Sequence, residues 1–175
     1  VGELIARKNH AVVLDALGKL EKKNQLEGIQ YVICGLGALD AELKKKAASL
    51  GITDQVYFLG YRNDVSEICN AADMFVFMSH QEGLPVALME AMACGLPVIC
   101  SDIRGNTDLV ENGENGEIVE ITPDAVANAI LKLKEDESLR NRYAQAAIST
   151  IKHFELSSVA TEVRDIYTNE TGNLL

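Results

Sequence analysis

The stretch Glu82-Gly83-Leu84-Pro85-Val86-Ala87-Leu88-Met89-Glu90 decides the fold of this 175-residue chain. It follows an apolar run at 74–78, so it predicts a buried strand, a tight turn and a helix in direct succession. The pattern places Pro85 at the first helical position, where a missing N–H costs nothing. The free N–H groups of the first turn and the positive end of the helix dipole then face the loop, which suits a phosphate group.

Two carboxylates flank this turn. Glu82 precedes the turn. Glu90 points back toward the N-terminal end of the helix, because helical Cβ atoms tilt toward the N-terminus. Glu90 lies among apolar residues in Met89-Glu90-Ala91-Met92-Ala93, and burying a lone carboxylate is costly, so we expect it to have a partner. The two hydroxyls of a ribose would supply suitable donors. A phosphate cradle with two carboxylates therefore points to a sugar nucleotide.

Outward from this stretch, apolar runs alternate with helical patterns. Strands are predicted at 29–34, 56–59, 74–78, 97–100 and 117–121. Helices are predicted after Asn9, which is expected to cap the first one, at 39–50, 64–72 and 84–94, from Thr122-Pro123, and at 139–152 and 156–169. This order predicts an α/β fold with a Rossmann-like, doubly wound parallel sheet and flanking helices. The loops 35–38, 60–63, 79–85 and 101–107 follow strands and should meet at the ligand-binding edge.

Length and the N-terminal sequence bear on domain organisation. Residues 1–175 fit a single domain. The start, Val1-Gly2-Glu3-Leu4, looks like the end of a strand, so we expect this domain to belong to a larger protein.

Composition narrows the function classes. A net charge of −10 argues against a nucleic-acid-binding surface and weakens any case for an anionic membrane. No apolar run has the length of a transmembrane helix, and no signal-peptide pattern is present. Without a Cys-x-x-Cys pair, free buried thiols in a reducing compartment are favoured over disulfides for Cys34, Cys69, Cys94 and Cys100. The three histidines lack ligand spacing, so no metal site is expected.

Three further motifs are weak on their own. Gly35-Leu36-Gly37 follows a strand as a dinucleotide fingerprint does, but Asp40 stands where the third glycine belongs, so a tight turn is favoured over an NAD site. Lys8 is either a phosphate ligand or a solvated lysine. Tyr61 and Arg62 follow Gly60; a planar side chain there either stacks on a base or is an ordinary surface residue.

Together, these motifs resemble the Glu-x7-Glu region of retaining glycosyltransferases of family 4, also called glycosyltransferase group 1. The resemblance covers essentially the whole chain. It is carried by residues 79–85 and 90–99, and by Gly2 through Lys8-Asn9, Gly35-x-Gly37, Phe58-Leu59-Gly60-Tyr61, Ala71-Ala72-Asp73, Ser101-Asp102 with Gly105, and Asn115-Gly116. It implies the GT-B architecture of two Rossmann-like domains, with this chain as the C-terminal, donor-binding one.

The resemblance also implies roles for single residues. Glu90 would hold the ribose hydroxyls of the donor, Glu82 would position the transferred sugar, and Lys8 would bind phosphate. The remaining donor-binding residues are implied to be Gly83, Leu84 and Pro85 at the diphosphate, Gly60, Tyr61 and Arg62 beside the base, and the loop glycines Gly35 and Gly37. No metal and no cofactor are expected.

One departure from the family pattern concerns the diphosphate. Many members carry Arg where this chain has Glu3, and that Arg joins the lysine in neutralising the leaving group. Either Arg7, Arg62 or Arg104 substitutes for that Arg, or the diphosphate is bound less strongly in this chain.

The resemblance implies transfer of a sugar, with retention, from a nucleotide diphosphate-sugar to a hydroxyl in polysaccharide or glycolipid synthesis. UDP-sugar is the donor expected from its frequency in the family. The expected partner is an N-terminal acceptor-binding domain of the same protein, with helix 156–169 packing toward it, and the isolated domain should be nearly inactive. A cytoplasmic location is expected. Any association with the inner face of the membrane would come from the part of the full-length protein that lies outside this chain.

Two alternatives stay open. One is a non-catalytic nucleotide-binding module, and the other is a sugar-nucleotide epimerase of similar architecture. A phosphorylase would need a pyridoxal phosphate lysine, and residues 74–100 contain no lysine.

Overall fold

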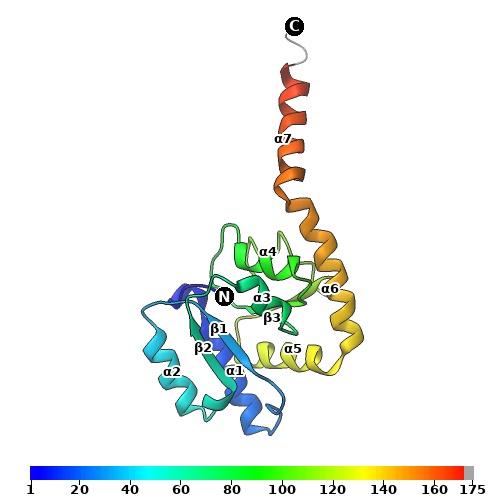
Figure 1. Ribbon diagram of the computed structural model, residues 1–175. Coiled ribbons are helices and arrows are strands. Elements are labelled where there is room, and N and C mark those ends of the chain that lie inside the picture. The colour runs from blue at the N-terminus through cyan, green and yellow to red at the C-terminus, as the bar shows by residue number, and fades with distance from the viewer. Residues whose placement is uncertain (172–175) are drawn as a thin grey trace.

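A computed structural model describes residues 1–171, in which helices alternate with parallel strands (Figure 1). The strands are β1 (Tyr31–Cys34), β2 (Val56–Gly60), β3 (Phe75–Phe77), β4 (Val98–Ser101) and β5 (Gly116–Val119). The helices are α1 (His10–Lys22), α2 (Asp40–Ser49), α3 (Val65–Asn70), α4 (Val86–Ala93), α5 (Pro123–Glu135), α6 (Glu137–Ile151) and α7 (Leu156–Thr171). Short 3₁₀ turns are η1 (Ala6–Lys8), η2 (Thr53–Gln55) and η3 (Lys152–Phe154). The predicted α/β class and its order of elements are confirmed, with ends shifted by a few residues.

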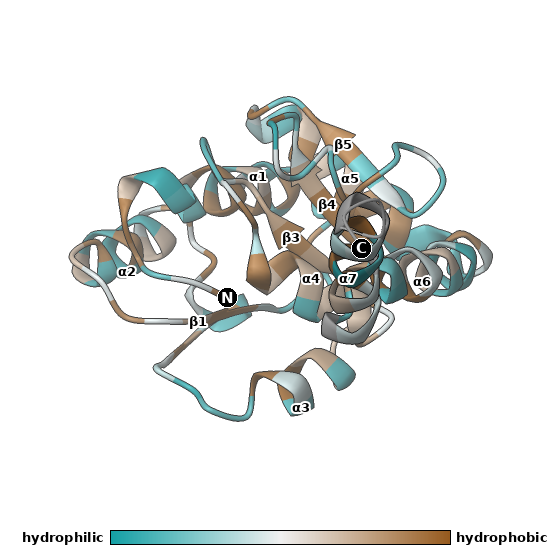
Figure 2. Cartoon of the chain, turned by 90° about the horizontal axis from the view of Figure 1, so that it is seen from above, coloured by the Kyte–Doolittle hydropathy of each residue, from teal (hydrophilic) through white to brown (hydrophobic). Residues whose placement is uncertain are grey.

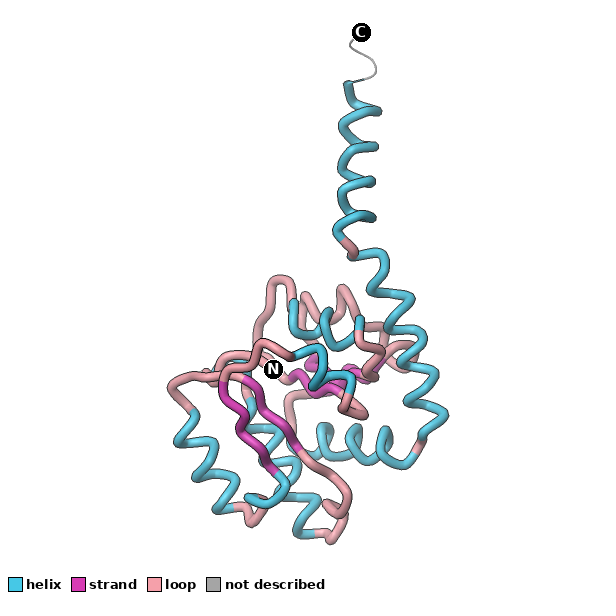
Figure 3. The backbone as a smooth tube through the Cα atoms, viewed as in Figure 1, coloured by secondary structure: helices cyan, strands magenta, loops and turns pink. Residues whose placement is uncertain are grey.

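The sheet is in two parts, which the sequence did not predict. β1 pairs with β2, and β3, β4 and β5 pair in that order, all in parallel. The two groups of strands are separate in Figure 3. Among residues 1–171, no strand joins the free edge of β1 to the free edge of β3.

Two apolar cores lie under these sheets. The larger one joins α1 and α5, through Leu14 and Leu17 on one helix and Ile130 and Leu133 on the other. The smaller one is built by β3, β4, α4 and α6, whose strands are hydrophobic along their length (Figure 2). Because the paired strands are parallel, their carboxyl ends, and the loops that follow them, lie at one edge of each sheet.

Helix starts differ in how well the sequence predicted them. Thr122 caps α5 by accepting a hydrogen bond from the Ala125 N–H at 3.2 Å, with Pro123 as the first residue, as predicted. Asn9 lies at the start of α1 but has φ 50° and ψ 43° and makes no side-chain cap bond, so the predicted capping was wrong. Pro85 was expected as the first residue of α4; it is the N-cap residue, with ψ 78°, and the helix begins at Val86.

Helix α7 continues the direction of α6 and stands away from the body of the molecule (Figure 1). Its described side chains include the exposed Val159, Val163 and Ile166, which recur at helical spacing on one face. No helix within the described residues is both long enough and apolar enough to cross a membrane. The four cysteines are free thiols, with Cys34, Cys69 and Cys100 buried and Cys94 partly buried, as predicted.

Candidate functional site

The loops 79–85 and 101–107 meet at the carboxyl edge of β3 and β4, as predicted. The buried Ser101 hydroxyl donates a hydrogen bond to the Ser79 carbonyl oxygen at 2.6 Å, and the Asn106 amide donates to the Ser101 carbonyl oxygen at 3.0 Å. Gly105 has φ 92°, and a Cβ there would come within 2.8 Å of the Gly83 carbonyl oxygen. This packing holds the Glu82-Gly83 segment in place.

Glu82 lies at the centre of the site and contacts two cations from the η1 turn. The Lys8 Nζ is 2.7 Å from Glu82 Oε1, and the Arg7 Nη1 is 3.4 Å from Glu82 Oε2. Arg7 also donates to the Gln81 carbonyl oxygen at 3.0 Å, while the His80 N–H donates to the Arg7 carbonyl oxygen at 2.8 Å. The η1 turn and the 79–85 loop are therefore joined across more than 70 residues of sequence.

The charges of this cluster favour an ionised Glu82. Its side chain is only 7% exposed, and this burial by itself raises the pKa of the carboxyl group. The hydrogen bond from Lys8 and the charges of Lys8 and Arg7 outweigh burial and hold the pKa below its ordinary value. Lys8 in turn lies 4.9 Å from the centre of the Phe77 ring and packs along Gly2, which fixes its direction.

The N-terminal end of α4 presents unpaired amide groups beside this cluster. Within residues 1–171, the N–H groups of Gly83 and Leu84 donate no hydrogen bond, while Pro85 has none to donate. Gly83 and Leu84 are exposed, and a Cβ at Gly83 would meet nothing within 4 Å. Two free donors thus lie on a loop that an anion can approach.

Glu90 is exposed, contrary to the burial expected from its apolar neighbours. Helix α4 buries Leu88, Ala91 and Met92 and leaves Val86 and Glu90 on its open face. In the described part of the chain, the Glu90 carboxylate makes no hydrogen bond or ion pair. Glu90 is therefore an accessible acceptor rather than a buried charge with a partner.

The loops 35–38 and 60–63 also lie together, because the Gly35 N–H donates to the Gly60 carbonyl oxygen at 2.7 Å. A Cβ on Gly35 would overlap the Gly2 carbonyl oxygen, and one on Gly37 would overlap the Leu4 backbone. This close approach accounts for both glycines as turn residues, the reading favoured from sequence. Gly60 has φ 67° and is followed by Tyr61, which is 78% exposed.

The three arginines weighed as substitutes at position 3 differ in their surroundings. Arg62 forms an ion pair with Asp64, which lowers the pKa of the Asp64 carboxyl group through the hydrogen bond between them. Arg104 is exposed and contacts no carboxylate in the described residues. Arg7 shares Glu82 with Lys8, and Glu3 is exposed. The one feature of the sequence that favoured Arg7 was its position next to Lys8.

The groups at this edge are of the kinds that can bind an anion and a polyol. Two cations and two free amides can hold phosphate oxygens, and two carboxylates can accept hydrogen bonds from hydroxyl groups. No group of His, Cys, Asp and Glu side chains suited to a metal ion occurs among the described residues.

Comparison with known proteins identifies the family of this chain. The model of the family glycosyl transferases group 1 matches residues 1–150. The chain is 30% identical over 175 residues to UDP-Gal:alpha-D-GlcNAc-diphosphoundecaprenol alpha-1,3-galactosyltransferase of Escherichia coli, with 99% of this chain and 45% of that protein covered. It is 29% identical to the phosphatidyl-myo-inositol mannosyltransferase of Mycobacterium tuberculosis, with 95% and 45% covered.

A solved structure shows the same fold. The crystal structure of Anabaena HepE in complex with UDP superposes with a TM-score of 0.87 at 24% identity, covering 96% of this chain and 47% of that one. The chain thus spans about half the length of these proteins and aligns with the C-terminal half of the GT-B fold.

Proposed function

The chain belongs to the family of glycosyl transferases group 1, and on that premise we propose that it is the donor-binding half of a retaining glycosyltransferase. The complete protein transfers a sugar from a nucleotide diphosphate-sugar to a hydroxyl group in glycolipid or polysaccharide synthesis. The relatives named above, a galactosyltransferase acting on a diphosphoundecaprenol-linked sugar and a phosphatidyl-myo-inositol mannosyltransferase, support this class of acceptor. The UDP in the HepE complex supports a UDP-sugar as donor.

The observation that carries the proposal is the cluster of charged and donor groups at the N-terminal end of α4. Lys8 and Arg7 contact the Glu82 carboxylate, and the free amides of Gly83 and Leu84 follow Glu82 directly in the chain. A diphosphate needs several donors and positive charge at one point, and this edge supplies both. Because the ammonium group of Lys8 has three donors, it can hold Glu82 and a phosphate oxygen at the same time.

In the proposed reaction, negative charge develops on the departing diphosphate. Lys8 and the amides of Gly83 and Leu84 stabilise that charge, so they lower the barrier more than they strengthen ground-state binding. Glu82 accepts hydrogen bonds from hydroxyls of the transferred sugar and orients it for attack on the face from which the diphosphate leaves. Two cations hold its carboxylate, which supports this positioning role over a covalent one.

The nucleoside part of the donor is assigned to the neighbouring loops. Glu90 accepts hydrogen bonds from the ribose hydroxyls, a role that its exposed and unpaired carboxylate allows. The base lies beside Gly60, Tyr61 and Arg62, where the exposed Tyr61 ring offers a flat surface. Pro85 is the last residue of the loop 79–85, which is assigned to the diphosphate. The glycine turn Gly35-Leu36-Gly37 forms the adjoining side of the donor site.

We assign to Arg7 the charge that position 3 lacks in this chain. Arg7 contacts the same carboxylate as Lys8, whereas Arg62 is held by Asp64. Arg7 is 45% exposed, so its guanidinium group can turn toward a bound diphosphate.

The acceptor site belongs to the half of the protein that is not in this chain. The relatives are about twice as long, and α7 extends away from the body with Val159, Val163 and Ile166 exposed on one face. We propose that this face packs against the preceding, acceptor-binding half. The isolated domain then binds the donor weakly and transfers little sugar, and the complete protein acts in the cytoplasm.

Calorimetric titration of UDP, GDP and ADP tests the donor site. UDP should bind the wild-type chain, and Glu90→Ala should weaken binding by about tenfold or more, since two hydroxyl hydrogen bonds to a charge are lost. Glu42→Ala, which removes an exposed carboxylate from α2, is the matched control and should bind as the wild type does. If none of the nucleotides binds, or if Glu90→Ala leaves the affinity unchanged, the donor-site assignment fails.

A further inference from the structure

Ser79 is the first residue of the loop 79–85, and hydrogen bonds from a neighbouring loop hold its backbone in place. Ser79 is fully buried, and its carbonyl oxygen accepts the 2.6 Å hydrogen bond from the Ser101 hydroxyl. The Asn106 amide group donates to that Ser101 hydroxyl oxygen at 3.1 Å, which orients it toward Ser79. The Ser79 side chain therefore starts from a fixed point, three residues before Glu82.

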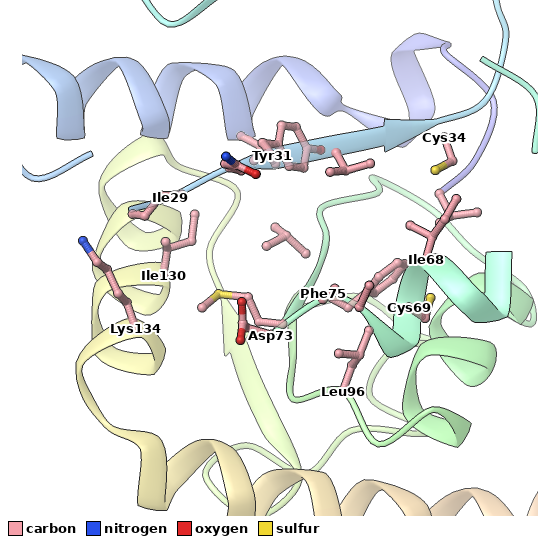
Figure 4. Close-up of a pocket in the computed structure, with 18 of the residues that line it drawn as sticks. Ile29, Tyr31, Cys34, Ile68, Cys69, Asp73, Phe75, Leu96, Ile130 and Lys134 are labelled. Carbon is pink, nitrogen blue, oxygen red and sulfur yellow. The ribbon is translucent and has the colours of Figure 1, made fainter. Parts of the chain in front are cut away.

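The hydroxyl group of Ser79 has no settled partner. Among residues 1–171, its Oγ makes no hydrogen bond of regular geometry, although a buried hydroxyl group is costly to leave unpaired. Water in the cavity of about 570 Å³ between β1 and β3 does not reach it, because Ser79 is not among the residues that line this cavity (Figure 4). The acceptor for this hydroxyl therefore comes from the loops around Ser79.

The Glu82 carboxylate is the acceptor that the charges favour. Burial raises the pKa of the Glu82 carboxyl group, while the donor groups of Lys8 and then of Ser79 lower it. The Ser79 hydroxyl and the carboxylate are thus close without being fully aligned, and a hydroxyl hydrogen is free to rotate toward an acceptor. The competing acceptor is the unpaired Oδ1 of the buried Asn106. Because that oxygen belongs to a neutral amide, it accepts less strongly than a carboxylate.

Donor binding changes which groups are free to hold Glu82. Lys8 and Arg7 contact the two oxygens of its carboxylate at 2.7 and 3.4 Å, and the proposed function assigns both cations to the diphosphate. Ser79 is 0% exposed, so a ligand does not compete for its hydroxyl. Of these three groups, Ser79 is the one that Glu82 does not have to share with the donor.

We propose that Ser79 is a positioning residue for sugar transfer. Its hydroxyl donates a hydrogen bond to the Glu82 carboxylate in the donor complex and keeps it directed at the hydroxyls of the transferred sugar, while Lys8 and Arg7 neutralise the diphosphate. This role, which rests on the proposed function of Glu82, belongs to a residue that neither sugar nor phosphate contacts. Removal of the hydroxyl therefore slows transfer without weakening nucleotide binding.

The carboxyl pKa of Glu82, measured by NMR in the 175-residue chain, tests the contact without any enzyme activity. Ser79→Ala should raise this pKa, because a donor to the charged form is lost. Thr150→Val is the matched control, since it removes a partly buried hydroxyl that contacts Asn115, and it should leave the pKa unchanged. An unchanged pKa in Ser79→Ala would overturn the proposal and make Asn106 the acceptor.

Transfer by the complete protein tests the positioning role itself. Ser79→Ala should lower kcat by about tenfold and leave KM for the donor and Kd for UDP within about twofold of the wild type. Ser79→Cys, with a weaker donor of similar size, should lie between the two. In a Glu82→Gln background, Ser79→Ala should change kcat by less than about twofold, because the charge that the hydroxyl orients is already absent.

The possible failures of this experiment are distinguishable. An equal fall of kcat in both backgrounds, with UDP binding intact, would overturn the role of Ser79 alone, because the loss would then be structural. A rise of KM in place of the fall of kcat would also overturn it. If Glu82→Gln transfers sugar as the wild type does, the proposed function of Glu82 fails, and the role of Ser79 fails with it.

Discussion

The Lys8 ammonium group donates a 2.7 Å hydrogen bond to the Glu82 carboxylate, and it joins a turn near the N-terminus to the loop after β3. Arg7 contacts the second oxygen of the same carboxylate. Glu82 therefore holds two cations beside the loop 79–85, and it would compete with a bound phosphate for them.

Replacement of Glu82 should separate binding from transfer. In Glu82→Gln, Lys8 and Arg7 lose a competing charge, so the affinity for UDP should stay the same or rise by up to about threefold. In the complete protein, sugar transfer should fall by about tenfold or more, because an amide accepts hydrogen bonds from hydroxyls less strongly than a carboxylate does. Calorimetry and a transfer assay measure the two effects, and a loss of UDP affinity equal to the loss of activity would contradict the positioning role.

The sequence predicted which loops form this site better than it predicted the burial and the partners of the residues in them. Strand-to-helix order was enough to place 79–85 beside 101–107, because parallel strands end at one edge. The sequence analysis wrongly predicted that Glu90 is buried, because the apolar composition of α4 does not tell which face of the helix the rest of the chain covers. It also failed for Asn9, whose left-handed backbone prevents the side-chain cap that its residue type favours. The Lys8–Glu82 pair joins residues far apart in sequence, and no local pattern encodes it.

Arg7 should matter for diphosphate binding more than the other two arginines weighed for this role. Arg7→Ala is expected to weaken UDP binding by about threefold to tenfold, and by less at high salt, because the side chain is partly exposed and its charge is screened. Arg104→Ala is the matched control, since Arg104 is also exposed and lies on the neighbouring loop. Calorimetry at two salt concentrations measures both variants. A larger loss in Arg104→Ala would assign the missing charge to that residue instead.

Gly37 should be essential to stability rather than to donor contact. A Cβ there overlaps backbone atoms of Leu4, so Gly37→Ala must displace one of two packed segments and should lower the free energy of unfolding by about 2 kcal/mol or more. Gly83→Ala is the control, because a Cβ at Gly83 meets nothing within 4 Å, and it should change stability by less than about 0.5 kcal/mol. Urea unfolding compares the two. Equal stability of both variants would show that residues 2–4 move away at no cost.

Stability should fall in mild acid because of His10. Burial, followed by the positive charges of the N-terminus and Lys8, lowers the pKa of His10 to about 4 from 6.5. The unfolded chain then binds a proton that the folded chain does not, so this stabilisation is present above pH 6.5 and is lost as pH falls toward 4. Between pH 7.5 and 5.5 the loss should be about 1.4 kcal/mol.

Urea unfolding at both pH values tests this origin. His10→Gln should remove the difference between pH 7.5 and 5.5, whatever its effect on stability itself. His80→Gln, which replaces an exposed histidine, is the control and should keep the difference. A slope that persists unchanged in His10→Gln would place the titrating group elsewhere.

The apolar face of α7 should matter only in the complete protein. Val163 is 46% exposed and lies between Val159 and Ile166 on that face, so Val163→Glu should leave Tm of the 175-residue chain within about 1 °C of the wild type. In the complete protein the new carboxylate would be buried against the preceding half without a partner, and Tm should fall by several degrees. Thr161→Glu, on the opposite side of the same helix, adds the same charge and should leave both proteins unchanged. Because the two substitutions differ only in the face of α7 that they alter, an equal loss of Tm in both would mean that the exposed stripe is not the contact surface.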